Sequence, residues 1–121
     1  MIPKILLIDD DQLVLKSFTN LLSKTGYEVI PTASYAEALK AFEEKEFDLV
    51  LSDIRMPGKN GVEAVSEIQS RLASVGKKDL PIVFITGYAA FSDQLNATFL
   101  GEVLTKPVDN EKLLMTIRDY L

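Results

Sequence analysis

Polar residues that can take part in chemistry stand at the ends of short apolar segments of this chain. Three of these segments are rich in aliphatic residues and are typical of strands buried on both faces: residues 4–9, 48–53 and 81–86. Residues 103–105 are a shorter and weaker strand candidate. The ends of these segments carry the following polar residues: Asp9, Asp10 and Asp11, then Asp53, then Thr86, and then Lys106. The carboxyl ends of parallel strands meet at one edge of a sheet, where open α/β sheets form their sites. We therefore expect these side chains to gather at that edge.

Three carboxylates brought close together repel one another and call for a positive charge nearby. A divalent cation is the simplest compensation, and an all-oxygen ligand set favours Mg²⁺, with Mn²⁺ as an alternative, over Zn²⁺. A cation held by one or two carboxylates keeps positions open for phosphate oxygens. An Asp carboxylate is also a nucleophile toward phosphorus, so the pattern predicts phosphoryl transfer to Asp53. Lys106 would then neutralise one phosphoryl oxygen, and the Thr86 hydroxyl would donate to another.

Amphipathic stretches separate the apolar segments, so the chain alternates strand and helix five times. A weaker strand is expected at residues 27–30. Apolar residues at helical spacing predict one helix that ends before Gly26, another that covers residues 62–72, and a less regular one over residues 89–99. This alternation predicts an α/β fold, with a parallel sheet covered by helices on both faces.

Several residues signal where the helices and turns begin. Ser34 and Glu37 have the spacing of a capping box, and Asp109 is placed to cap the last helix. Asp11 is interpreted as the cap of the first helix rather than as a third ligand. Gly61 is expected to serve a turn in which glycine tolerates positive φ.

Length and composition restrict the class of protein. The 121 residues are enough for one domain, which we take to cover residues 1–121, and the net charge of −5 argues against direct binding of nucleic acid. The chain has no Cys and no His, which excludes disulfides, thiolate chemistry and a Ser–His–Asp triad. No signal peptide or membrane-spanning run is apparent in the sequence, so a cytoplasmic location is the expectation.

Four motifs carry a resemblance to a known family over essentially the whole chain. They are Ile8-Asp9-Asp10, Asp53-Ile54-Arg55-Met56-Pro57-Gly58 with Gly61, Ile85-Thr86-Gly87, and Leu104-Thr105-Lys106-Pro107. Each is weak alone, but all four in this order and at about these spacings are specific. The chain resembles the receiver domain of two-component response regulators.

This resemblance implies a flavodoxin-like, doubly wound parallel sheet of five strands in the order 2-1-3-4-5. It implies that Asp53 is the phosphoacceptor and that Thr86 and Lys106 assist it. The metal ligands it implies are Asp9, Asp10, Asp53 and the backbone carbonyl of Arg55. Asp10 would bind the cation directly and Asp9 largely through water. The family also leads us to expect a cis bond between Lys106 and Pro107.

The resemblance further implies a signalling switch rather than an enzyme. A sensor histidine kinase or a histidine phosphotransfer protein would supply the phosphoryl group. An output domain or a downstream protein would receive the signal. Members of the family often form dimers through their last helices, so a homodimer is a further expectation. Thr86 would move toward the phosphoryl group. The family often has an aromatic residue where this chain has Val103, so an aromatic switch is not expected at that position.

Two other functions compete with the switch. A phosphatase of the haloacid-dehalogenase type also uses an Asp nucleophile, Mg²⁺, Thr and Lys, but it needs a further acidic pair near a later strand. Beyond Lys106 only Asp109, Glu111 and Asp119 remain, on or capping a helix. The other alternative is an interaction module that works without phosphorylation. The presence of Asp9, Asp10, Asp53, Thr86 and Lys106 together argues against it.

Overall fold

The computed structural model describes residues 2–54, 60–87, 97–98 and 100–121. Within them lie five strands: β1 (Lys4–Ile8), β2 (Glu28–Thr32), β3 (Leu49–Asp53), β4 (Ile82–Thr86) and β5 (Glu102–Thr105). The helices assigned in the same ranges are α1 (Gln12–Lys24), α2 (Tyr35–Glu44), α3 (Gly61–Ser74) and α5 (Asn110–Tyr120). The expected helix at 89–99 falls mostly outside the described residues.

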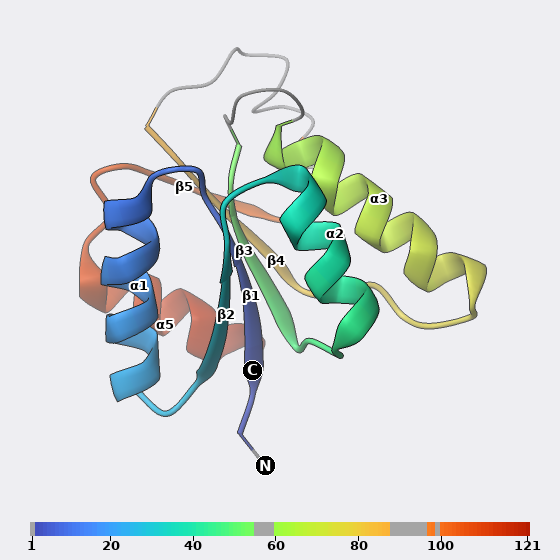
Figure 1. Ribbon diagram of the computed structural model, residues 1–121. Helices are drawn as coiled ribbons and strands as arrows, with labels where there is room; N and C mark the ends of the chain where they lie inside the picture. The colour runs from blue at the N-terminus through green and yellow to red at the C-terminus, as the bar shows by residue number, and fades with distance from the viewer. Residues whose placement is uncertain (1, 55–59, 88–96, 99) are drawn as a thin grey trace.

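The strands form one parallel sheet in the order β2-β1-β3-β4-β5. Helices α1 and α5 cover one face of the sheet, and α2 and α3 cover the other (Figure 1). The predicted fold class, doubly wound and flavodoxin-like, is therefore confirmed. From β1 the chain crosses to β2 on one side and later to β3 on the other, so the strand order reverses between β1 and β3.

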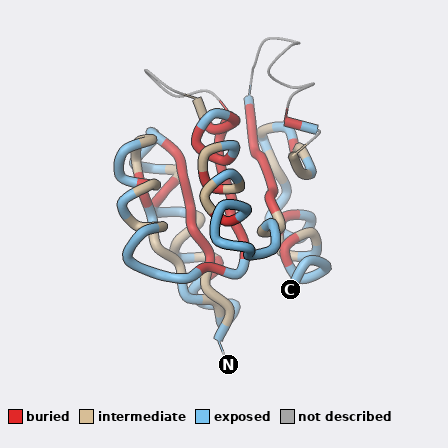
Figure 2. Tube along the Cα trace, turned by 90° about the vertical axis from the view of Figure 1, so that its right-hand side faces the viewer, coloured by how far each residue is buried: buried red, intermediate tan, exposed pale blue. Residues whose placement is uncertain are grey.

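Alternate residues of each strand pack against opposite helical layers, as the period of two along a strand requires. On β1, Leu6 and Ile8 belong to the core shared with α2 and α3, whereas Ile5 and Leu7 belong to the core shared with α1 and α5. Figure 2 shows the buried residues gathered in the central strands, with exposed residues on the outer sides of the helices. Both faces of the sheet are therefore packed with apolar residues, and the polar residues lie at the ends of the strands.

The helix starts agree with the sequence signals in position but not in every bond. Asp11 caps α1, because its carboxylate accepts from Leu13 N and Val14 N. Ser34 caps α2 through Glu37 N, but the Glu37 carboxylate turns back to Ala33 N and the Ser34 hydroxyl instead of closing a box.

The other two helix starts differ more from expectation. Asp109 occupies the cap position of α5 without a side-chain cap bond. The full capping box lies at the start of α3, between Asn60 and Glu63, and is not among the helix signals predicted above.

The interpretation of Gly61 as a positive-φ turn residue is wrong. Gly26 and Gly76 have positive φ, whereas Gly61 is the first residue of α3. Glycine is needed there because a Cβ atom would lie 1.7 Å from the carbonyl oxygen of Asp53. The constraint is therefore a close approach between α3 and β3.

None of the helices in the described parts of the chain is long and apolar enough to cross a membrane. The Lys106–Pro107 bond is cis, as expected.

The buried centre of the sheet yields a first prediction. Phe84 is fully buried on β4, so Phe84→Ala should lower the free energy of unfolding by about 3–5 kcal/mol through lost burial and a cavity. Met115→Ala, at an exposed position of α5, should change it by less than about 0.5 kcal/mol. Urea denaturation followed by circular dichroism measures both, and equal losses would contradict this view of the core.

Candidate functional site

Asp9 leaves β1 at the edge of the sheet where the strands end. Its backbone N–H donates to the carbonyl of Thr32 at 3.1 Å, which continues the ladder with β2 by one residue. Its carboxylate accepts from Asp11 N at 2.9 Å, and Asp11 in turn caps α1. This local chain of bonds leaves Asp9 only 2% exposed, while Asp10 between the two is exposed. The turn therefore presents one buried and one open carboxylate.

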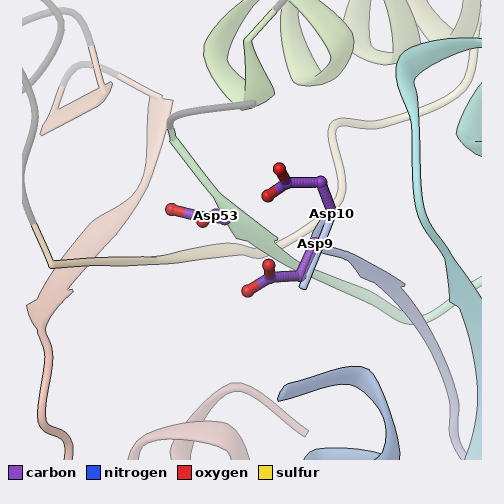
Figure 3. A group of neighbouring side chains, drawn as sticks. All are labelled: Asp9, Asp10 and Asp53. Atoms are coloured by element: carbon purple, nitrogen blue, oxygen red, sulfur yellow. The ribbon is translucent and has the colours of Figure 1, made fainter. Parts of the chain in front are cut away.

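Asp53 is the last residue of β3, the strand next to β1, and it is also buried. Strand order reverses between these two strands, which is where open α/β sheets place their ligands. Asp9, Asp10 and Asp53 each offer a carboxylate oxygen, and these oxygens lie within 4.8 Å of one another. Figure 3 shows the three carboxyl groups pointing to the same side of the sheet edge. An oxygen cluster of this kind suits a hard divalent cation.

Lys106 reaches the cluster from the far strand. It follows β5, and its backbone N–H donates to the carbonyl of Thr86 at 2.8 Å, which holds it against the end of β4. Its Nζ lies 3.3 Å from Asp9 Oδ2 and 3.4 Å from Asp53 Oδ2. One ammonium group therefore bridges two buried carboxylates that come from different strands.

The two directions of pKa change follow from this geometry. Burial raises the pKa of the Asp9 carboxyl, and the Asp11 N–H and the Lys106 charge only partly offset it. Burial acts to lower the pKa of Lys106, but the charges of Asp53 and Asp9 outweigh it and leave the pKa raised. Lys106 thus stays protonated at neutral pH. Ionisation of the buried Asp9 carboxyl lowers the free energy of unfolding.

The remaining predicted site residues are placed less directly. Thr86 is buried at the end of β4, one residue beyond Ile85, which is the register partner of Asp53. It therefore stands at the same edge of the sheet. Arg55, whose carbonyl is an expected ligand, lies outside the described residues.

Sequence reasoning missed one polar residue beside the site. Ser52 is buried on β3, and its hydroxyl donates to the Asp53 carbonyl at 2.8 Å. A serine inside an otherwise apolar strand, directly before the expected phosphoacceptor, was the available signal.

The structure thus belongs to the class of open parallel α/β domains, with an acidic cluster and a lysine at the switch point where such sheets bind their ligands. Residues 5–118 match the sequence model of a family described as "Response regulator receiver domain", so this chain belongs to the receiver domain family of response regulators. The resemblance inferred from the four motifs is confirmed.

Individual relatives agree with this membership. The transcriptional regulatory protein GlrR of Escherichia coli (strain K12) is 35% identical over 119 residues, which cover 97% of this chain but 26% of that protein. The polar-differentiation response regulator DivK of Brucella ovis is 28% identical and is matched over 98% of its length.

A solved structure matches as well. The response regulator protein TrrA from Thermotoga maritima, in complex with Mg²⁺-BeF, has a TM-score of 0.85 and 30% sequence identity. The match covers 99% of this chain and all of that one.

The raised pKa of Asp9 yields a second prediction. Without divalent cations at pH 7, Asp9→Asn should raise the free energy of unfolding by on the order of 1 kcal/mol. The substitution removes a buried charge, keeps an oxygen for Asp11 N, and leaves Lys106 paired with Asp53. Folding raises this pKa, so the penalty is present above the folded-state pKa and vanishes as the pH falls below the unfolded value. The advantage of the variant should therefore shrink in acid.

Urea titrations in EDTA across this pH range measure the effect. Asp119→Asn, at an exposed position of α5, is the matched control and should leave stability unchanged. A variant less stable than the wild type at pH 7 would contradict the assignment of the penalty to Asp9.

Proposed function

We propose that this chain is a phosphoacceptor switch of a two-component phosphorelay, and that residues 1–121 form its receiver domain. The observation that carries the proposal is the meeting of Asp9, Asp10 and Asp53 with Lys106 at the switch point of the sheet. Membership of the receiver family supports it. The haloacid-dehalogenase phosphatase is not favoured, because Glu111 and Asp119 lie on α5 and do not belong to the carboxylate cluster of Asp9, Asp10 and Asp53.

The proposed reaction is transfer of one phosphoryl group to Asp53. A carboxylate oxygen of Asp53 forms a bond to phosphorus as the P–N bond of the donor phosphohistidine breaks. The released imidazole nitrogen takes up a proton from water, and Asp53 becomes an acyl phosphate. Lys106 Nζ, already 3.4 Å from Asp53 Oδ2, would pair with a phosphoryl oxygen. The Thr86 hydroxyl would donate to another.

We propose Mg²⁺, with Mn²⁺ as a substitute, as the cofactor. Asp10 and Asp53 would bind it directly, Asp9 largely through water, and the Arg55 carbonyl would complete the protein's share. The donor set fits, since three carboxylate oxygens from two strands lie within 4.8 Å of one another. When bound, the cation would neutralise charge on the phosphoryl oxygens. The Mg²⁺-BeF complex of TrrA supports this choice.

The proposed partners are those that such a reaction needs. A sensor histidine kinase or a histidine phosphotransfer protein would supply phosphohistidine, since this chain has no His of its own. Phosphorylation would shift a pre-existing equilibrium toward the active form, with Thr86 carrying the change toward β5 and α5. An output domain, a downstream protein or a second copy of the chain would receive it.

Phosphorylation can be tested with a small phosphodonor. With Mg²⁺ and acetyl phosphate, the wild type should gain the mass of one phosphoryl group, because Asp53 can attack phosphorus without a kinase. Asp53→Ala should gain none, and Asp119→Asn should behave as the wild type does. Intact-mass spectrometry reads all three. An unmodified wild type would favour the interaction module that works without phosphorylation, and a modified Asp53→Ala would move the phosphoacceptor elsewhere.

The unequal roles of the neighbouring acids give a fourth prediction. Mg²⁺ at a hundredfold excess over its Kd should stabilise the wild type by about 2.7 kcal/mol, because it binds only the folded chain. Asp10→Asn should lose most of this gain. Asp11→Asn should retain it, because Asn caps a helix as well as Asp does and Asp11 is not a proposed ligand.

Thermal unfolding with and without Mg²⁺ measures these differences. Loss of the Mg²⁺ effect in Asp11→Asn, or its persistence in Asp10→Asn, would contradict the roles given to the two residues.

A further inference from the structure

The start of α3 lies in direct contact with the backbone of the proposed phosphoacceptor. Gly61 is buried at the first position of α3, and its N–H donates to the carbonyl of Ile54 at 2.8 Å. The place that a Cβ would take at Gly61 is 1.7 Å from the Asp53 carbonyl oxygen and 2.9 Å from its carbon. In glycine a hydrogen occupies that direction, so the Cα–H group points at the Asp53 carbonyl as a weak donor.

Ser52 acts on the same carbonyl oxygen from within β3. Its hydroxyl donates to Asp53 O at 2.8 Å, and it is itself 2.5 Å from the place of a Cβ at Gly61. Ser52 is only 1% exposed, so water does not compete for this bond. Gly61, Ser52 and the Asp53 carbonyl thus form a three-group contact, which we call the β3–α3 clamp.

The clamp and the carboxylate lie on opposite sides of the strand. Successive side chains of a strand alternate between faces, so Ser52 points toward the layer that contains α3 and the Asp53 side chain points away from it. The carboxylate meets Asp9 and Lys106, which come from other strands. Within the described residues, the clamp is therefore a restraint on Asp53 that is independent of the charged cluster.

We infer that Gly61 is a positioning residue for phosphoryl transfer. Because it has no side chain, α3 and Ser52 can hold the Asp53 backbone in the position from which the Asp53 carboxylate reaches the phosphodonor and the cation. This inference rests on the proposed function. Real Cβ atoms are essentially never found within 3.0 Å of a backbone atom, so a methyl group at Gly61 must separate α3 from β3. A separation of roughly 1 Å at a reacting group is enough to slow a reaction by on the order of a hundredfold.

A purely structural role for Gly61 is the competing explanation, and the chain contains a matched control for it. At Gly101 a Cβ would lie 2.2 Å from the carbonyl oxygen of Ile82 and 2.7 Å from its Cβ. Gly101 precedes β5, and Ile82 is the first residue of β4. This contact therefore lies at the amino ends of the strands, whereas Asp53 lies at the carboxyl end of β3. Gly101→Ala should therefore disturb packing to a similar degree without moving the phosphoacceptor.

The experiment compares the wild type, Gly61→Ala and Gly101→Ala at a temperature where all three are folded by circular dichroism. The rate of modification by acetyl phosphate is followed by intact mass over a range of Mg²⁺ concentrations. At saturating Mg²⁺ we expect Gly61→Ala to react about 10–100-fold more slowly than the wild type, and Gly101→Ala to stay within about twofold of it. The rate at saturation separates misplacement of the nucleophile from a change in Mg²⁺ affinity.

Each outcome has a distinct meaning. Equal rates at saturating Mg²⁺ for Gly61→Ala and Gly101→Ala would overturn the inference and leave the proposed function intact. A wild type that takes no phosphoryl group would overturn the proposed function itself. Should Gly61→Ala not fold, Ser52→Ala decides instead, because it removes one bond to the Asp53 carbonyl without adding an atom. A rate several-fold below the wild type would support the clamp, and an unchanged rate would overturn it.

Discussion

The ammonium group of Lys106 lies between the carboxylates of Asp9 and Asp53, and the rest of the site depends on this contact. Two buried acids on adjacent strands repel each other, and burial already raises the pKa of Asp9. One lysine lowers the repulsion but cannot remove the cost of burying both charges. The folded chain therefore keeps negative charge at the carboxyl ends of the strands, where a divalent cation could neutralise it.

The sheet makes this arrangement possible because it is apolar on both faces. Residues such as Leu6 and Phe84 fix the strands between two helical layers, so the strand ends cannot move apart to relieve the repulsion. The clamp formed by Gly61 and Ser52 adds a backbone restraint beneath Asp53. A cluster of like charges on a closely packed sheet fits the proposed switch, because binding of a cation there changes the electrostatic balance without unfolding the domain.

Much of the fold could be predicted because its signals are local. Aliphatic runs mark strands such as β3, and helical spacing marks the buried face of α3 at Val65 and Ile68. Helix starts were predicted less well. The cap bonds at Ser34 and Asn60 depend on how each side chain finds its partner, which residue type alone leaves open.

By itself the sequence determined the strand–helix alternation, the acids at the strand ends and, through its four motifs, the receiver family. These are properties of residue type and order, which act over a few neighbouring positions. Only the tertiary structure decided that Lys106 bridges Asp9 and Asp53, that Asp10 stays open while Asp9 is buried, and that Gly61 touches the Asp53 backbone. The Lys106 contacts join segments far apart in the chain, and the Gly61 contact joins the start of α3 to the end of β3, so both exist only once the helices and strands have packed.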